Sequence, residues 1–194
     1  MPMKRGLFLV LAWLPAWAWG GGFVTPPPEW PGNKWCVKCD LSGADLRRVE
    51  MVGVMLPGSN LAGADLREAN LRGGRFFKAR LAKANLSGAN LQEARMKECD
   101  LGGSILKGTD LRRAYLEQVN LEGADLAGAD LRGATLEGAF MRNSSLAGAD
   151  LRDAVLFGAN MTGSDFSGAD LSGAYWFSGK RCRAGSVGRC ELEQ

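Results

Sequence analysis

The sequence predicts a regular coil made of flat sides, and three features of one internal repeat predict it. From Leu41 to Trp176 every fifth residue is large and apolar, and none of these 28 positions is polar. Two residues before each of them lies a small or short residue, which is Ala in 17 of the 28 units. Two residues after each of them, Gly occupies 17 of the 28 positions. A period of five fits neither a helix nor a strand, but it fits a coil with one pentapeptide on each side.

Each position of the pentapeptide has a physical role in such a coil. The large and the small residues face inward and form the core, while the other three positions face solvent. The frequent Gly falls where the backbone must turn sharply at a corner. Asp or Asn stands directly before the large residue in 16 of the 28 units, where its side chain can accept hydrogen bonds from nearby backbone N–H groups. No insertion shifts the register, so one uninterrupted coil is expected.

These residues match the consensus A(D/N)Lxx, as in Ala44-Asp45-Leu46 and Ala129-Asp130-Leu131, and the chain resembles the pentapeptide repeat family. The resemblance spans 140 residues, from Cys39 to Ser178. It implies an all-β fold over residues 36–178, a right-handed quadrilateral β-helix with four pentapeptides per coil and about seven coils. At ~4.8 Å between hydrogen-bonded strands, such a rod is roughly 34 Å long.

The residues before the repeat are predicted to be an export signal and a linker. Lys4 and Arg5 precede an apolar run, and Ala16-Trp17-Ala18 fits the small-x-small cleavage pattern. The run of about 14 residues is shorter than the ~20 of a spanning helix, which favours a signal peptide over residues 1–18, cleaved after Ala18, rather than an uncleaved membrane anchor. Residues 19–35, rich in Gly and Pro, are expected to form a linker. The prediction is a periplasmic or secreted protein with no membrane span after cleavage, in a compartment where disulfides persist.

The composition excludes several classes of function. The chain contains no His, which rules out Ser-His-Asp and Cys-His catalysis and every His-containing metal site. Lys and Arg number 24 against 21 Asp and Glu, and removal of Lys4 and Arg5 leaves 22 − 21, or +1. So balanced a charge gives no reason to expect nucleic-acid binding. Pairs of carboxylates and frequent Gly follow from the repeat itself, so we expect no catalytic residues, no metal and no cofactor.

Residues 20 apart should stack in successive coils, so the sequence can be read as four faces. The side around Met51, Leu71, Leu91 and Leu111, here called the ladder face, carries one column of outward residues: Glu50, Asn70, Asn90, Asp110, Asp130, Asp150 and Asp170. A second column runs beside it: Arg72, Arg112, Arg132 and Arg152. The arginines should offset the repulsion between carboxylates ~4.8 Å apart and give a solvated, self-neutralising face. A dock for a charged partner is the alternative.

The side from Leu56 to Trp176, here called the aromatic face, collects most of the outward aromatic residues. Toward one end it carries the candidate partner-binding residues, here called the basic-aromatic patch: Arg75, Phe77, Lys78, Arg95, Lys97 and Tyr115. Near the other end it carries a candidate C-terminal apolar patch: Val155, Phe157, Tyr175 and Phe177. Apolar surface rimmed by charge marks interaction sites. A protein or envelope partner is expected at the first patch, with irregular surface decoration as the alternative. The second patch is either covered by the tail, residues 179–194, or mediates a homodimer.

The five cysteines are assigned partly through the family resemblance. Cys36 and Cys39 resemble the family's Cys-x-x-Cys-Asp-Leu start, and Cys182 and Cys190 its Cys-x7-Cys tail, which implies a disulfide at each end of the rod. A redox-active Cys-x-x-Cys is the alternative at the first pair. Cys99 falls at a small inward position, three coils or roughly 14 Å from Cys39, and should be a buried free thiol. The two pairs lie at opposite ends, which argues against a four-Cys zinc site.

Two functions remain as hypotheses. The first is an exported, non-enzymatic scaffold of the cell envelope, structural or protein-binding, with an unknown protein or envelope partner. The second, suggested by the family resemblance, is a DNA mimic that inhibits or protects a topoisomerase or another enzyme. The export signal, a charge near +1 rather than strongly acidic, and a short rod without a projecting loop all count against the second hypothesis.

Overall fold

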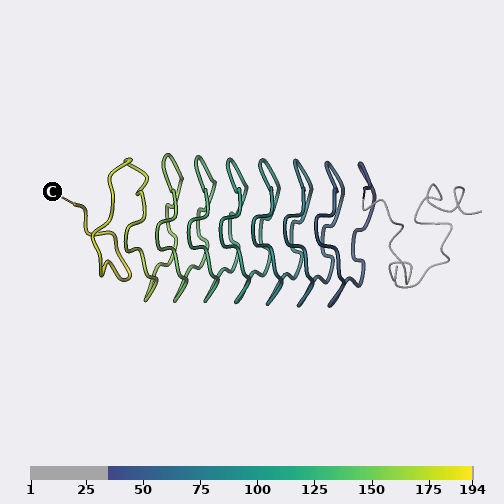
Figure 1. Cartoon of the computed structure of the whole chain (residues 1–194), viewed down its shortest axis with the longest axis horizontal. Coiled ribbons are helices and arrows are strands. Elements are labelled where there is room, and N and C mark those ends of the chain that lie inside the picture. The colour runs from purple at the N-terminus through teal and green to yellow at the C-terminus, as the bar shows by residue number, and fades with distance from the viewer. Residues whose placement is uncertain (1–34, 194) are drawn as a thin grey trace, which may run out of the picture.

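The computed structural model describes residues 35–193. The predicted signal peptide (1–18) and all but the last residue of the predicted linker (19–35) lie outside these residues. Within the described range there is no helix. From Trp35 to Tyr175 the regular structure consists of isolated single-residue β-bridges at every fifth residue, separated by two-residue turns, and the tail adds further isolated bridges. The chain winds into a rod of stacked coils (Figure 1).

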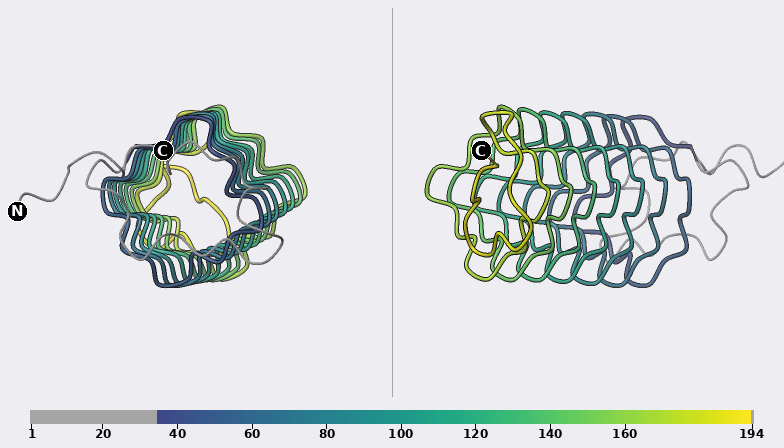
Figure 2. Two further views of the ribbon diagram at one scale, coloured as in Figure 1. Left: turned by 90° about the vertical axis from the view of Figure 1, so that its right-hand side faces the viewer. Right: turned by 60° about the vertical axis from the view of Figure 1, so that its left-hand side comes forward.

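Four pentapeptides make one coil. Every parallel bridge joins residues that are 20 apart, from Trp35 and Met55 at one end to Val155 and Tyr175 at the other. Backbone hydrogen bonds flank each bridge in the parallel pattern: at the Asp45–Asp65 bridge, the Leu46 N–H donates to the carbonyl of Asp65 at 2.7 Å and the Asp65 N–H donates to the carbonyl of Ala44 at 2.9 Å. Seen along its axis, the rod has a four-sided outline (Figure 2). The pentapeptide register predicted from the sequence is confirmed.

The inside of the rod is filled by the two inward positions of each unit. The large residues of one column, such as Leu66, Leu86 and Leu106, are fully buried. Phe76 is the largest fully buried side chain, and it fits because Gly74 occupies the preceding small position. A Cβ at Gly74 would lie 2.5 Å from Cε2 of Phe76. The absent side chain of Gly74 thus compensates for the large ring of Phe76, and the core stays close-packed.

The corners require left-handed backbone. At the second turn residue of the repeat, Gly has φ between 61° and 76°, for example 66° at Gly63. The non-Gly residues at this position adopt the same conformation, as at Glu68 with φ 58°. Such angles strain L-residues and suit Gly, which accounts for the frequent Gly. The Asp or Asn of the unit supports the turn: Asp130 Oδ1 accepts the backbone N–H of Arg132 at 3.2 Å.

The tail pairs with the last coil in the antiparallel sense. Antiparallel bridges join Tyr175 to Arg181 and Asp170 to Val187. The Leu171 N–H donates to the carbonyl of Ser186 at 2.8 Å. The tail thereby supplies backbone partners at the C-terminal end of the rod, where it is drawn in yellow (Figures 1 and 2).

Candidate functional site

On the ladder face, the charges pair into a continuous row. Arg112 Nη2 lies 2.6 Å from Oδ2 of Asp110 in its own unit, and Arg112 Nε lies 3.6 Å from Oδ2 of Asp130 in the next coil. Arg132 and Arg152 repeat this geometry, with 2.6 Å to their own Asp and 3.5 and 3.7 Å to the next. Arg112, Arg132 and Arg152 therefore each bridge two stacked carboxylates, which supports the interpretation of a self-neutralising face. Arg72 of the same column instead lies 3.8 Å from Oε1 of Glu93.

This pairing lowers the pKa of the carboxyl groups. Hydrogen bonds from the Arg112 side chain hold the pKa of Asp110 below its usual value, and those from Arg152 do the same for Asp150. On the adjacent side, the Arg47 side chain lowers the pKa of Asp45 to about 2. Carboxylates held in the ionised form by arginine are poor proton donors near neutral pH.

On the aromatic face, side chains of the basic-aromatic patch are open to solvent. Phe77 and Tyr115 are each 45% exposed. Lys78 Nζ lies 5.1 Å from the Phe77 ring centroid and 3.3 Å from Oε2 of Glu98. The Arg95 guanidinium lies 5.6 Å from the Tyr115 ring centroid, within the range of a cation–π contact. The patch thus presents aromatic rings with cations held against them.

A groove of about 640 Å³ lies at the corner between the aromatic face and the ladder face. Its lining is Gly73, Arg75, Glu93, Arg95, Arg113, Tyr115, Gly133 and Thr135. The structure brings Arg75, Arg95 and Tyr115 of the predicted patch into this groove, whereas Phe77, Lys78 and Lys97 lie outside its lining. Sequence reasoning by single faces missed Arg113 and Glu93, because both belong to turns of the ladder face. Reading adjacent columns together across the corner would have found them.

The C-terminal apolar patch stays largely uncovered by the tail. Phe157 and Phe177 are each 52% exposed, and Tyr175 is 44% exposed even with Arg181 lying 5.8 Å from its ring centroid. Val155 is half-buried. The tail also approaches this patch at Gly179, where a Cβ would lie 3.4 Å from the Phe157 ring. The tail therefore pairs with the end of the rod and leaves the apolar patch on its side open.

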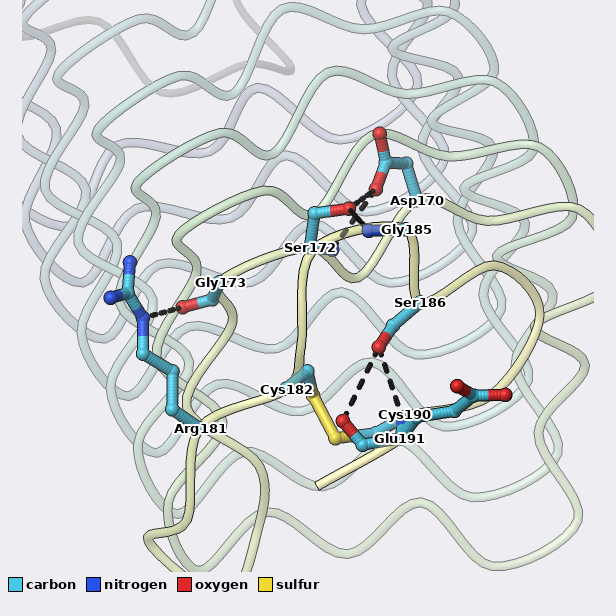
Figure 3. The surroundings of a disulfide bond; sticks show 9 residues. All are labelled: Asp170, Ser172, Gly173, Arg181, Cys182, Gly185, Ser186, Cys190 and Glu191. Atoms are coloured by element: carbon cyan, nitrogen blue, oxygen red, sulfur yellow. Dashed lines mark hydrogen bonds between the residues drawn. A yellow bond between two sulfur atoms is a disulfide. The ribbon is translucent and has the colours of Figure 1, made fainter. Parts of the chain in front are cut away.

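Both predicted cysteine pairs form disulfides in the structure. The Cα atoms are 5.8 Å apart in Cys36–Cys39 and 5.1 Å apart in Cys182–Cys190. Ser59 Oγ ties the first pair to the second coil, accepting from the Cys39 N–H and donating to the Cys36 carbonyl, both at 3.1 Å. At the other end Cys182 is fully buried, and Ser186 Oγ accepts the Glu191 N–H at 3.1 Å beside the disulfide (Figure 3).

Cys99 is a free, buried cysteine in the core. Its Sγ donates to the carbonyl of Phe76 at 2.8 Å, and burial raises the pKa of the thiol to about 12. A protonated, enclosed thiol is a poor nucleophile.

A cluster of metal ligands and a membrane-spanning helix are both absent from residues 35–193. No group of three or more Cys, Asp or Glu side chains in this range is placed to hold a metal ion. None of the described residues belongs to a helix long and apolar enough to cross a membrane.

The fold defines a class of protein: a four-sided β-solenoid built from stacked pentapeptides, with a buried core and outward-facing side chains on each side. The family model for pentapeptide repeats matches in 8 copies, over residues 36–73, 75–108, 109–146 and 141–173. The chain belongs to the pentapeptide repeat family.

Solved structures of the family resemble the chain. HetL, a pentapeptide repeat protein involved in heterocyst differentiation regulation from the cyanobacterium Nostoc sp. strain PCC 7120, is 30% identical, with 76% of this chain and 80% of HetL covered and a TM-score of 0.39. Rfr23 from the cyanobacterium Cyanothece 51142 is 26% identical, with 74% and 91% covered and a TM-score of 0.30. QnrB1, a plasmid-mediated fluoroquinolone resistance protein, is 20% identical, with 67% and 78% covered and a TM-score of 0.45. A comparison with curated proteins gave no match.

Proposed function

We propose that this chain is an exported, non-enzymatic pentapeptide repeat protein that acts as a scaffold in the cell envelope and binds a protein partner on its aromatic face. The observation that carries the proposal is the exposed basic-aromatic patch, where Phe77 and Tyr115 stand beside Arg75 and Arg95. Aromatic rings and arginine are the side chains that most often anchor protein interfaces.

Export is supported by the N-terminal sequence and by the cysteines. The basic residues, apolar run and Ala-x-Ala motif of residues 1–18 fit a signal peptide. Four of the five cysteines form disulfides at the two ends of the described rod. Disulfides of this kind persist in the periplasm or outside the cell and are rare in the cytosol.

A non-enzymatic role is supported by the state of the reactive side chains. The chain has no His, the free thiol of Cys99 is buried with a raised pKa, and ladder-face carboxylates such as Asp110 and Asp150 have lowered pKa values. None of these groups is poised for proton transfer or nucleophilic attack near neutral pH.

The alternative function, a DNA mimic acting on a topoisomerase or another enzyme, has weaker support. Such a mimic needs a surface of uncompensated negative charge. Along the ladder face, Asp110, Asp130 and Asp150 each hold an arginine of their own unit at 2.6 Å. A homodimer through the C-terminal end stays an alternative occupant of the open patch formed by Val155, Phe157, Tyr175 and Phe177.

The proposal is tested by the intact mass of the native protein from fractionated cells, with thiol alkylation after denaturation and without reduction. The expected result is a chain in the envelope or medium fraction that lacks residues 1–18, carries one alkylated thiol and retains two disulfides. A full-length chain in the cytosol with five alkylated thiols would overturn the export proposal. That result would favour the alternative function, which topoisomerase assays would then test.

A further inference from the structure

The arginines of the rod are unevenly paired with carboxylates. Of the 15 arginines in residues 35–193, nine have a guanidinium nitrogen within 4.0 Å of a carboxylate oxygen in the described part of the chain. Three of the remaining six, Arg75, Arg95 and Arg113, line the corner groove. Unpaired arginines are thus concentrated at one site.

The groove brings these arginines together without neutralising them. Arg75 and Arg95 are bridge partners in successive coils, and Arg95 lies against the Tyr115 ring. The carboxylate of the lining, that of Glu93, lies 3.8 Å from Arg72, which is outside the lining. Two cations on neighbouring positions of successive coils repel each other, so the site favours an occupant that supplies negative charge.

The shape of the corner leaves room for that occupant. Along the turn column that borders the groove, Gly73 and Gly133 flank the longer side chains of Glu93 and Arg113. A Cβ at Gly73 would meet nothing within 4 Å. The missing side chains therefore open the corner on both sides of the arginine cluster.

We propose that the groove binds the carboxylates of a short acidic segment of a protein partner; this inference rests on the proposed scaffold function. Arginine forks match carboxylate groups geometrically and bind them by paired, charge-assisted hydrogen bonds. Phe77, in the same unit as Arg75, offers an exposed ring beside the groove for an apolar residue of that segment.

A short segment fits the surroundings better than a long polyanion. Glu117 and Glu137 follow on the same aromatic face, and Glu93 lies in the groove itself. The positive field is therefore confined to one spot, whereas nucleic acid or an anionic membrane requires an extended basic surface.

The test is calorimetric titration of the full chain, with its disulfides formed, using an unlabelled eight-residue peptide that contains four Glu and one Phe. The same peptide with Gln in place of Glu is the control ligand. The variant Arg75→Gln/Arg95→Gln should lower the affinity for the acidic peptide at least about tenfold. The matched variant Arg112→Gln/Arg132→Gln removes the same charge from the ladder face and should change the affinity less than about twofold.

Several results would overturn the inference: no binding by the wild-type chain, equal binding of the Gln peptide, or equal losses in the two variants. Tighter, Arg75- and Arg95-dependent binding of single-stranded DNA or of anionic vesicles would assign the groove to another class of ligand. The proposed scaffold function is separable, because partner crosslinking from position 77 in cells does not require the peptide to bind. Crosslinking without peptide binding would reject only the acidic-segment chemistry.

Discussion

The ladder face and the aromatic face share one backbone and one core, yet the column of arginines on the first is paired with carboxylates, whereas Arg75 and Arg95 on the second have no such partner among residues 35–193. On the ladder face, Asp110 stands directly before the large residue and Arg112 follows two positions later, so the pair closes within the unit at 2.6 Å. On the aromatic face, Arg75 and Arg95 take the position of the Asp, and Phe77 and Lys97 follow two positions later. The order of residues within a pentapeptide therefore decides whether a face is neutralised or left available for a ligand.

The prediction with the largest expected effect concerns the disulfide at the C-terminal end of the rod, away from the groove of the aromatic face. Removal of the tail disulfide by Cys182→Ser/Cys190→Ser should lower the free energy of unfolding by about 2–3 kcal/mol, because a short closed loop is released in the unfolded chain. The affinity of the groove for the acidic peptide should not change. Guanidinium denaturation without reductant measures the first quantity and calorimetry the second.

Cys99→Ala is the control for this prediction, since it removes a cysteine and keeps both disulfides. A parallel loss of peptide affinity in the Cys182→Ser/Cys190→Ser variant would show that the groove depends on the C-terminal end. The contrast between the faces would then not be a local property of their outward residues.

The second prediction concerns the core beneath the basic-aromatic patch. Gly74→Ala places a methyl group against the Phe76 ring, where a Cβ would lie only 2.5 Å from Cε2, and should destabilise the protein by about 1–3 kcal/mol through overpacking. In a Phe76→Leu background the same change should cost less, because the ring is gone and only the contact of the Cβ with the Leu71 carbonyl oxygen at 2.9 Å remains. Denaturation of the four proteins of this double-mutant cycle measures the coupling. Additive effects would contradict this account of the packing.

The third prediction compares the charges of the two faces directly. Arg112→Gln/Arg132→Gln should lower the denaturation midpoint slightly, because Asp110 and Asp130 lose their arginine partners and Asp150 keeps only that of its own unit, Arg152. Arg75→Gln/Arg95→Gln should leave the midpoint unchanged or raise it, because two stacked like charges are removed. Salt should reduce both effects. Urea denaturation at low and high ionic strength is the measurement, and equal destabilisation by the two variants would contradict the contrast.

The smallest expected effect is the dependence of stability on pH. The folded-state pKa of Asp45 is about 2, and those of Asp110 and Asp150 are also lowered, whereas an unfolded Asp titrates near ~3.9. These groups therefore stabilise the fold above about pH 4, and their contribution is lost as the pH falls toward about 2. The ladder variant Arg112→Gln/Arg132→Gln should show a weaker loss in this window than the groove variant Arg75→Gln/Arg95→Gln. Measuring the free energy of unfolding of both variants from pH 5 to pH 2 tests this prediction.

Much of the fold could be predicted from the sequence, because a five-residue period leaves little choice of register. The pairing of Arg112 with stacked Asp residues also followed from columns 20 residues apart. The groove could not be predicted from these columns, because Glu93 and Arg113 reach it from the neighbouring side across a corner. The exposure of Phe157 and Phe177 could not be predicted either, because the tail lies outside the repeat and its path depends on pairing with the last coil.

The most direct test of the central claim, that the aromatic face binds a partner and the ladder face does not, is site-specific photocrosslinking in cells. A benzoylphenylalanine replaces Phe77 in one strain and Arg132 in another. The account predicts a discrete crosslinked species in the envelope or medium fraction from position 77, lost when Arg75→Gln/Arg95→Gln is added, and none from position 132. Equal crosslinking from both positions, or crosslinking from position 132 alone, would contradict it.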